Sequence, residues 1–286
     1  MSAHRIKFVC DSASDLPAAW RARWDISIIP VFVNFGDESF PDDGVSLTHE
    51  EFYRRMAESK VPPTTSAPSA GVAADVLRKA LDGADHVIAF TISPAVSSTY
   101  NAVRLAAQQV AADRITVYDT GTMSMAMGWQ IVAACEARER GADREGILAA
   151  VADARQRADV WAIPGSLEYL RRGGRVNRIV SSIGTLLQIK PIITVKEGVV
   201  DSKQRARTFK KAFETVAEQI HQRAPLAGLA ILHTNAPDLA EQMRALLADI
   251  APSDSDRTVI LNVAAAIGVH FGPGSVGVAT LSAPRT

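Results

Sequence analysis

A glycine-rich stretch near the C-terminus, HFGPGSVG, carries glycines in the GxGxxG spacing of dinucleotide-binding loops. A loop of that kind opens a helix and is followed, about 20 residues later, by an acidic side chain. The segment after Gly277, VATLSAP, is instead typical of a strand and contains no acidic residue. We therefore expect a glycine and proline turn between two strands, with His270 at the end of the first strand. His270 would then face any cleft beside the turn, although a lone histidine is more often structural.

Hydroxyl side chains gather in two further stretches, TTSAPSAG and ISPAVSSTYNA, each of which precedes a predicted helix. The first contributes Thr65, Ser66 and Ser69, and the second contributes Ser97, Ser98 and Thr99. The unpaired N–H groups and partial positive charge of a helix start attract anions, and hydroxyls add donors. Ordinary N-capping is the better explanation of each stretch when it is considered alone. Two such starts at the ends of parallel strands favour an anion site, because open α/β sheets bind ligands there.

The stretch LRRGGRVN places Arg171, Arg172 and Arg175 around a Gly173-Gly174 turn. A guanidinium can hold a carboxylate or a phosphate through its planar pair of N–H donors, and glycines let the backbone approach another group closely. A solvated basic turn is the alternative interpretation. The apolar run IVSSIGTLLQIKP that follows has neither a helix period nor a strand period, so we expect it in the core or along a cavity.

The elements that would position these residues differ between the two halves of the chain. In the first half, strands about 25 to 35 residues apart alternate with helices, which predicts βαβ crossovers and a parallel sheet. Within it, ISIIPVFVNF is predicted to be one strand, and Thr48 and Glu51 are spaced as a capping box. In the second half, IITV and VVDSKQRAR flank a Glu197-Gly198 turn and predict a β-hairpin, while TVILNVAAAIGVH and SVGVATL predict a further pair of strands.

We predict an α/β protein with two α/β domains and a ligand between them. The N-terminal domain, residues 1–158, would have a mainly parallel sheet flanked by helices. The C-terminal domain, residues 159–286, would have a mixed sheet and helices. Asp11 and Asp119 end predicted strands, and we expect them to cap helices or stabilise turns.

Composition excludes several classes of function. Lysine plus arginine and aspartate plus glutamate both total 31, so the formal net charge is zero, and the basic stripe that nucleic-acid binding needs is missing. Cys10 and Cys135 match no metal-ligand spacing and are expected to be small buried apolar residues in a reducing compartment. No secretory signal and no run of about 18 apolar residues is present, which predicts a cytoplasmic protein.

Seven stretches in order are similar to those of the DegV family of bacterial proteins. They are DSASDLP, TTSAPS, ISPAVSSTYNA, VYDTGTMSMAMG, YLRRGGRV, IGTLLQIKPII and HFGPGSVG, and they span nearly the whole chain. The resemblance implies two α/β domains with a long-chain fatty acid buried between them. It also implies a role like that of the fatty-acid-binding subunit of bacterial fatty acid kinase. In that system a separate ATP-dependent kinase protein phosphorylates the bound carboxylate to an acyl-phosphate.

The same resemblance implies which residues hold the carboxylate. The expected contacts are Thr65, Ser66, Ser97, Ser98, Arg175 and His270. Arg172, Gly173 and Gly174 are candidates for contact with a partner or a phosphate, and Arg172 is the alternative to Arg175 at the carboxylate. The chain departs from the family pattern at Ser98, where glycine is common, and at Ala67, where glutamine is usual. Ser98 adds a side chain beside the carboxylate, and Ala67 removes an amide contact.

We therefore expect a lipid-binding protein rather than an enzyme, without cofactor or metal, that presents a fatty acid to a partner kinase. Lipid transport or sequestration without a kinase is the alternative, because a kinase would be encoded elsewhere. A third hypothesis is an acyl-ester hydrolase with Ser97 as nucleophile and His270 as base, although Ser97 lacks the GxSxG elbow. Transient contact with a membrane is compatible with each role in lipid handling.

Overall fold

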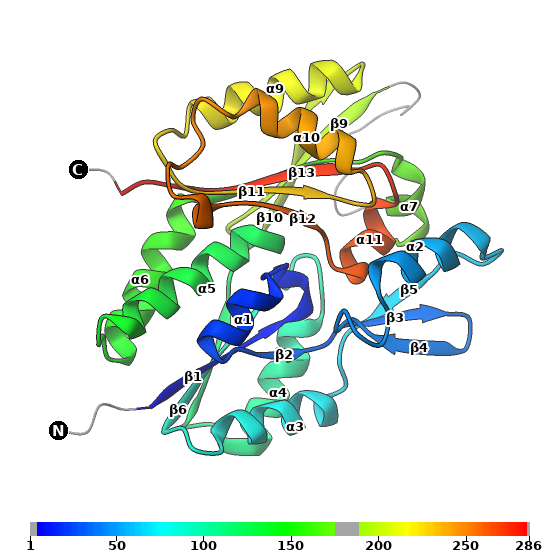
Figure 1. The fold of residues 1–286 in the computed structure, drawn as a ribbon. Coiled ribbons are helices and arrows are strands. Elements are labelled where there is room, and N and C mark those ends of the chain that lie inside the picture. The colour runs from blue at the N-terminus through cyan, green and yellow to red at the C-terminus, as the bar shows by residue number, and fades with distance from the viewer. Residues whose placement is uncertain (1–4, 175–188, 285–286) are drawn as a thin grey trace.

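Four strands in the first half of the chain form a parallel sheet, as the alternation of apolar runs and helices predicts (Figure 1). The structure, a computed structural model, describes residues 5–174 and 189–284, without the side chain of Lys203. The sheet has the order β2-β1-β6-β7 and comprises β1 (Ile6–Asp11), β2 (Ser27–Ile29), β6 (His86–Thr91) and β7 (Ile115–Asp119). Helices α3 (Ala70–Leu81) and α4 (Thr99–Ala111) cover one face. Helices α1 (Ala18–Trp24) and α5 (Ser124–Glu139) pack on the other face, with α6 (Arg144–Arg157) beside α5.

The second half forms a mixed sheet of six strands in the order β10-β9-β8-β13-β11-β12. They are β8 (Ala158–Ile163), β9 (Lys190–Lys196), β10 (Val199–Ala206), β11 (Leu226–His233), β12 (Thr258–Asn262) and β13 (Val276–Ser282). The predicted hairpin is confirmed, since β9 and β10 pair antiparallel around Glu197 and Gly198, both of which have positive φ. Helices α9 (Phe209–His221) and α10 (Pro237–Leu246) cover the outer face, while α5 and α6 lie between the two large sheets (Figure 1).

A small third sheet stands beside the first. It comprises β3 (Phe32–Phe35), β4 (Glu38–Pro41) and β5 (Thr64–Ser66), with α2 (His49–Glu58) packed against it. The prediction that ISIIPVFVNF forms one strand is wrong, because the segment divides at Pro30 between β2 and β3, which belong to different sheets. Proline has no N–H for a sheet hydrogen bond, and the next N–H, that of Val31, donates to the Ser12 hydroxyl at 3.1 Å.

The C-terminal segment contains a helix where the sequence predicts a strand. The two predicted strands are present as β12 and β13, but β12 ends at Asn262 and helix α11 (Ala265–Phe271) begins shortly after it, so the prediction that the first strand continues to His270 is wrong. The Asp42 carboxylate accepts hydrogen bonds from the N–H groups of Ala265 and Ala266, both at 3.1 Å. This carboxylate, from a segment more than 200 residues away in the chain, satisfies donors that a helix start leaves unpaired. The glycine and proline turn is therefore a connection from α11 to β13 rather than between two strands.

The fold class is the predicted one, an α/β protein with a parallel sheet, a mixed sheet and flanking helices. One cluster of buried side chains runs from Phe8 in β1 through Trp129 in α5 to Ala279 in β13. Because this core is continuous across residue 158, the division into domains 1–158 and 159–286 stays a prediction. Within the described parts of the chain, no helix combines the length and apolar character that crossing a bilayer requires.

Cys10 and Cys135 are both fully buried free thiols, as predicted. Burial raises the pKa of each thiol to about 12. Both thiols therefore stay protonated at neutral pH and act as small apolar groups.

Asp11 and Asp119 have the structural roles expected of them. The Asp11 carboxylate accepts hydrogen bonds from the N–H groups of Ile92, at 2.7 Å, and Ala13, at 3.0 Å, and so ties the ends of β1 and β6 together. The Asp119 carboxylate accepts a hydrogen bond from the Gly121 N–H at 2.8 Å in the turn after β7.

Asp15 joins the starts of α5 and α11. Its carboxylate accepts hydrogen bonds from the Ala264 N–H, at 2.7 Å, and from the Ser124 hydroxyl. Burial raises the pKa of Asp15 to about 7 although both hydrogen bonds oppose the shift, and the Asp42 carboxylate adds to the rise. Because the folded-state pKa lies above the ordinary value of about 3.9, the stability that protonation of Asp15 contributes is fully present below about pH 3.9. That contribution is lost as the pH rises through about 7.

The substitution Asp15→Asn should remove this pH dependence without breaking the joint. An amide can accept from the Ala264 N–H and donate to the Ser124 hydroxyl, and asparagine tolerates the left-handed backbone of residue 15, at φ 54. Between about pH 5 and about pH 8, we expect the free energy of unfolding of the wild type to fall relative to the variant by on the order of 1 kcal/mol or more. Urea denaturation at several pH values measures this. Asp25→Asn is the matched control, because Asp25 has the same backbone conformation and an exposed side chain. If the free energy of unfolding changes with pH in the same way for the wild type and Asp15→Asn, the raised pKa assigned to Asp15 is contradicted.

Candidate functional site

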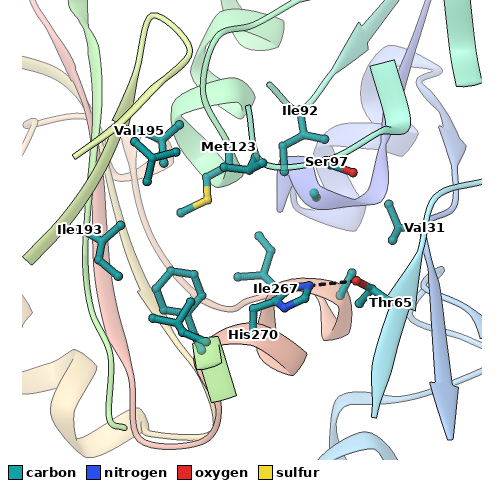
Figure 2. A pocket seen from close by; sticks show the side chains of 15 residues that line it. Val31, Thr65, Ile92, Ser97, Met123, Ile193, Val195, Ile267 and His270 are labelled. Atoms are coloured by element: carbon teal, nitrogen blue, oxygen red, sulfur yellow. Dashed lines mark hydrogen bonds between the residues drawn. The ribbon is translucent and has the colours of Figure 1, made fainter. Parts of the chain in front are cut away.

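An apolar cavity lies where the parallel sheet, the small sheet, α11 and the β9–β10 hairpin meet (Figure 2). Its empty space amounts to about 660 Å³ when the open solvent at its mouth is counted. Its apolar lining consists of Ala13, Val31, Ile92, Val96, Met123, Leu170, Ile193, Val195, Val200, Ala266, Ile267 and Phe271. These residues come from both halves of the chain, so both halves contribute to the cavity.

Three polar side chains, Thr65, Ser97 and His270, complete the lining. Thr65 Oγ1 and His270 Nε2 are hydrogen-bonded at 2.9 Å, and Figure 2 shows this pair facing Ser97 across the cavity. The Ser97 hydroxyl is 2.8 Å from Thr99 Oγ1 and accepts the Thr99 N–H at 3.3 Å. A hydroxyl, an imidazole and a helix start thus gather beside an otherwise apolar surface. Such a combination suits a ligand with a long apolar part and one polar or anionic group.

Each of the three is positioned by a different element. Thr65 lies in β5 opposite Val33 of β3, Ser97 lies just before α4, and His270 lies in the last turn of α11. The structure places these three of the predicted residues at one cavity, and their role in binding a carboxylate stays a prediction. The sequence prediction places Thr65 in a loop and His270 in a strand, however, and the structure corrects both elements.

Two other predicted hydroxyls lie outside the cavity. Ser66 follows Thr65 in β5 and is exposed, with its hydroxyl accepting a hydrogen bond from Asn34 Nδ2 at 3.3 Å. Successive residues of a strand point to opposite faces, so Thr65 and Ser66 cannot both face the cavity. Ser98 is exposed at the N-cap of α4 and does not line the cavity. Ser69, rather than Thr65 or Ser66, caps α3 through a hydrogen bond from the Val72 N–H at 3.2 Å.

The Gly173-Gly174 turn touches the polar end of the cavity through Gly173. Arg172, at the end of α7 (Leu167–Arg172), is exposed and forms an ion pair with Glu168 at 2.6 Å. Arg175 lies outside the described residues. Gly173 packs so closely against the His270 ring that a Cβ atom at this position would collide with Nδ1. Gly174 follows with a positive φ of 69°.

Sequence reasoning names none of the apolar lining residues individually, although VYDTGTMSMAMG contains Met123. One signal in the sequence is that Ile92 and Met123 follow strands β6 and β7 at the edge where parallel sheets bind ligands. Asp42 is also missed, and only its contact with α11 reveals it. Among the described residues, no group of three or more His, Cys, Asp or Glu side chains could hold a metal ion.

The contact between Gly173 and His270 predicts a steric effect that a double mutant can isolate. Gly173 has φ −72°, which alanine adopts freely, so Gly173→Ala acts through the collision with His270. We expect a loss of roughly 1–3 kcal/mol of stability, most of which His270→Ala should restore in a double-mutant cycle measured by urea denaturation. Gly174→Ala is the control, because a Cβ there meets open space and its cost is backbone strain at φ +69°. If Gly173→Ala lowers the free energy of unfolding equally in the wild type and in the His270→Ala background, the contact is contradicted.

Comparison with known proteins agrees with the resemblance seen in the sequence. The family model described as "Uncharacterised protein, DegV family" matches residues 5–283. A DegV domain-containing protein of Deinococcus radiodurans is 33% identical over 280 residues, which cover 96% of this chain and 97% of that protein. One solved structure is described as fatty acid binding of a DegV family protein from Thermus thermophilus. It has a TM-score of 0.88 and 34% identity, and the match covers 98% of this chain and 100% of that one.

A second solved structure, of a Thermotoga maritima protein, is described as revealing a fatty acid binding function. It has a TM-score of 0.85 and 26% identity, and it covers 98% of this chain and 100% of that one. The matches extend over nearly the whole length of every protein compared. The chain therefore belongs to the DegV family.

Proposed function

We propose that this protein binds a long-chain fatty acid, with the acyl tail in the apolar cavity and the carboxylate beside Thr65, Ser97 and His270. The observation that carries the proposal is the asymmetry of the cavity, whose lining is apolar except for these three side chains. The fatty acid binding described for the Thermus and Thermotoga relatives supports the same ligand class. The cavity also lies between the two halves of the chain, in keeping with the proposed domains 1–158 and 159–286.

The polar end selects the carboxylate. A hydrogen bond from an uncharged donor to a charged oxygen contributes roughly 1.5–3 kcal/mol, and the start of α4 beside Ser97 adds about 0.3–1 kcal/mol. Desolvation of the carboxylate opposes both terms. Arg175 is proposed as a further contact, because it follows the Gly173-Gly174 turn and Gly173 touches His270. These groups orient the ligand and favour an acid over an ester or an alcohol.

The acyl tail supplies most of the affinity. Each buried methylene contributes about 0.8 kcal/mol, so roughly fifteen of them contribute on the order of 12 kcal/mol before association costs. Side chains such as Ile92, Ile193 and Val195 offer the aliphatic surface that such a chain needs. Affinity and selectivity therefore come from opposite ends of the ligand.

We further propose that the bound carboxylate is presented to a separate ATP-dependent kinase, which forms an acyl-phosphate. In this view the protein is a binding subunit without catalytic residues or cofactor of its own, and it works in the cytoplasm with transient contact to membranes. The exposed Arg172 and the Gly173-Gly174 turn lie next to the polar end, where a partner would approach the carboxylate. Transport or sequestration of fatty acid without a kinase is the second candidate function, supported by the same cavity.

The hydrolase hypothesis has less support. The Ser97 hydroxyl is hydrogen-bonded to Thr99, and the hydrogen bond described for His270 Nε2 is to Thr65. A nucleophile activated by a base requires those two side chains to be within hydrogen-bond reach of each other.

The proposal predicts that fatty acid is released when the purified protein is denatured, and that mass spectrometry of the extract detects it. Thr65→Val and Ser97→Ala should each weaken fatty acid binding roughly 10-fold or more, the equivalent of one charge-assisted hydrogen bond, while an alcohol of equal length binds as before. Ser66→Ala and Ser98→Ala are matched controls, since both remove an exposed hydroxyl that lies outside the cavity. Losses as large in the controls as in the test variants would refute this placement of the carboxylate.

The kinase role has its own test. The protein is mixed with a candidate bacterial fatty acid kinase, ATP and free fatty acid, and acyl-phosphate is measured. We expect Arg175→Ala to reduce acyl-phosphate formation more than it reduces fatty acid binding. If several such kinases give no acyl-phosphate while fatty acid stays bound, transport or sequestration becomes the better account.

A further inference from the structure

A second, smaller cavity adjoins the first between α11 and the six-stranded sheet. Its empty space amounts to about 340 Å³ when open solvent is counted, and its surface is almost entirely apolar. Its walls include Val160, Trp161, Ala162, Leu232, Val263 and Val276. Apolar cavities of this kind stay free of ordered water and accept apolar groups.

Three side chains, Met123, Ile267 and Phe271, line both cavities and so form a partition between them. All three are buried, with 7%, 9% and 7% of their surface exposed. Ile267 and Phe271 are four residues apart in α11 and so lie on the same face of the helix. Met123 comes from the N-cap of α5, and Figure 2 shows its thioether end pointing into the first cavity.

Met123 is the member of the partition best suited to move. Its backbone is held on both sides, because the Thr122 hydroxyl donates to the Val195 carbonyl at 2.7 Å and the Ser124 hydroxyl donates to Asp15. Its side chain is unbranched and adapts easily to neighbouring shapes. Ile267, by contrast, is β-branched and has little rotamer freedom in a helix.

We propose that this partition sets the acyl-chain length that the protein holds. A chain that outgrows the first cavity displaces the Met123 side chain, and its end enters the second cavity against β8, β11 and β13. This inference rests on the proposed fatty acid function and assigns its chain-length specificity to named residues.

The first test opens the partition. We would measure the affinity of the wild type, Met123→Ala and Val200→Ala for saturated fatty acids of about twelve to about twenty carbons. Each additional buried methylene is expected to raise the affinity about fourfold. Relative to the wild type, Met123→Ala should favour the longest over the shortest acids by roughly tenfold or more. Val200→Ala is the control, because Val200 lines the first cavity and not the second. It should change the affinity for all lengths to a similar degree.

The second test fills the far cavity and leaves the partition intact. Ala162 lines the second cavity and not the first, so Ala162→Leu should weaken binding of the longest acids roughly tenfold while the shortest bind as in the wild type. This variant keeps the proposal testable if Met123→Ala fails to fold. If either variant folds and its affinity depends on acyl-chain length in the same way as that of the wild type does, the role of the partition is overturned. The proposed fatty acid function would still stand. If the wild type binds none of the acids, the proposed function fails and this inference fails with it.

Discussion

The hydrogen bonds from the start of α11 to the Asp42 carboxylate are the interaction on which the site depends. Helix α11 has seven residues, too few to be stable in isolation. Burying a carboxylate is costly unless strong donors surround it. The N–H groups of Ala265 and Ala266 supply such donors, and Asp15 holds the preceding Ala264 N–H in the same way. The helix that these carboxylates fix carries both His270 and two members of the partition, so one anchored element positions the polar end and the apolar boundary of the cavity.

Close packing around α11 explains the glycines of the sequence motifs. Gly173 allows the turn after α7 to touch the His270 ring, and Gly272 lies against the Tyr169 ring where a Cβ would collide. Gly272 also has a positive φ of 67°, which glycine adopts without strain. The GxGxxG spacing in HFGPGSVG therefore reflects a tight connection between α11 and β13, and it has no relation to a phosphate-binding loop.

The cavity separates two physical tasks between its surfaces. Apolar walls would provide a binding free energy that grows with the length of an apolar ligand, but they cannot distinguish an acid from another long molecule. In the function we propose, Thr65, Ser97 and His270, which line the cavity, would make that distinction through hydrogen bonds whose net contribution is small. Under the proposed function, such a site would hold its ligand by the acyl tail and keep the carboxylate in a defined place, as presentation to a partner protein would require.

Local sequence patterns were sufficient to predict those helices, strands and turns whose conformation depends on residues close together in the chain. The alternation of apolar runs and helices predicts the parallel sheet, and the Glu197-Gly198 turn predicts the β9–β10 hairpin. Thr48 caps α2 through the Glu51 N–H at 3.2 Å, as its spacing predicts. The Glu51 carboxylate, however, pairs with Arg54 and Arg55 rather than completing the capping box.

Where a distant contact decides the outcome, the sequence alone was insufficient. A run as short as that of α11 has no period that separates helix from strand, and the deciding partner, Asp42, is more than 200 residues away in the chain. Thr65 and Ser66 are chemically similar neighbours, and only the pairing of β5 with β3 determines which of them faces the cavity. The sequence by itself thus determined the family, the α/β class and three of the polar side chains of the site. The tertiary structure decided which elements carry them, the shape of the cavity and its partition, because packing between segments far apart in the chain leaves no local pattern.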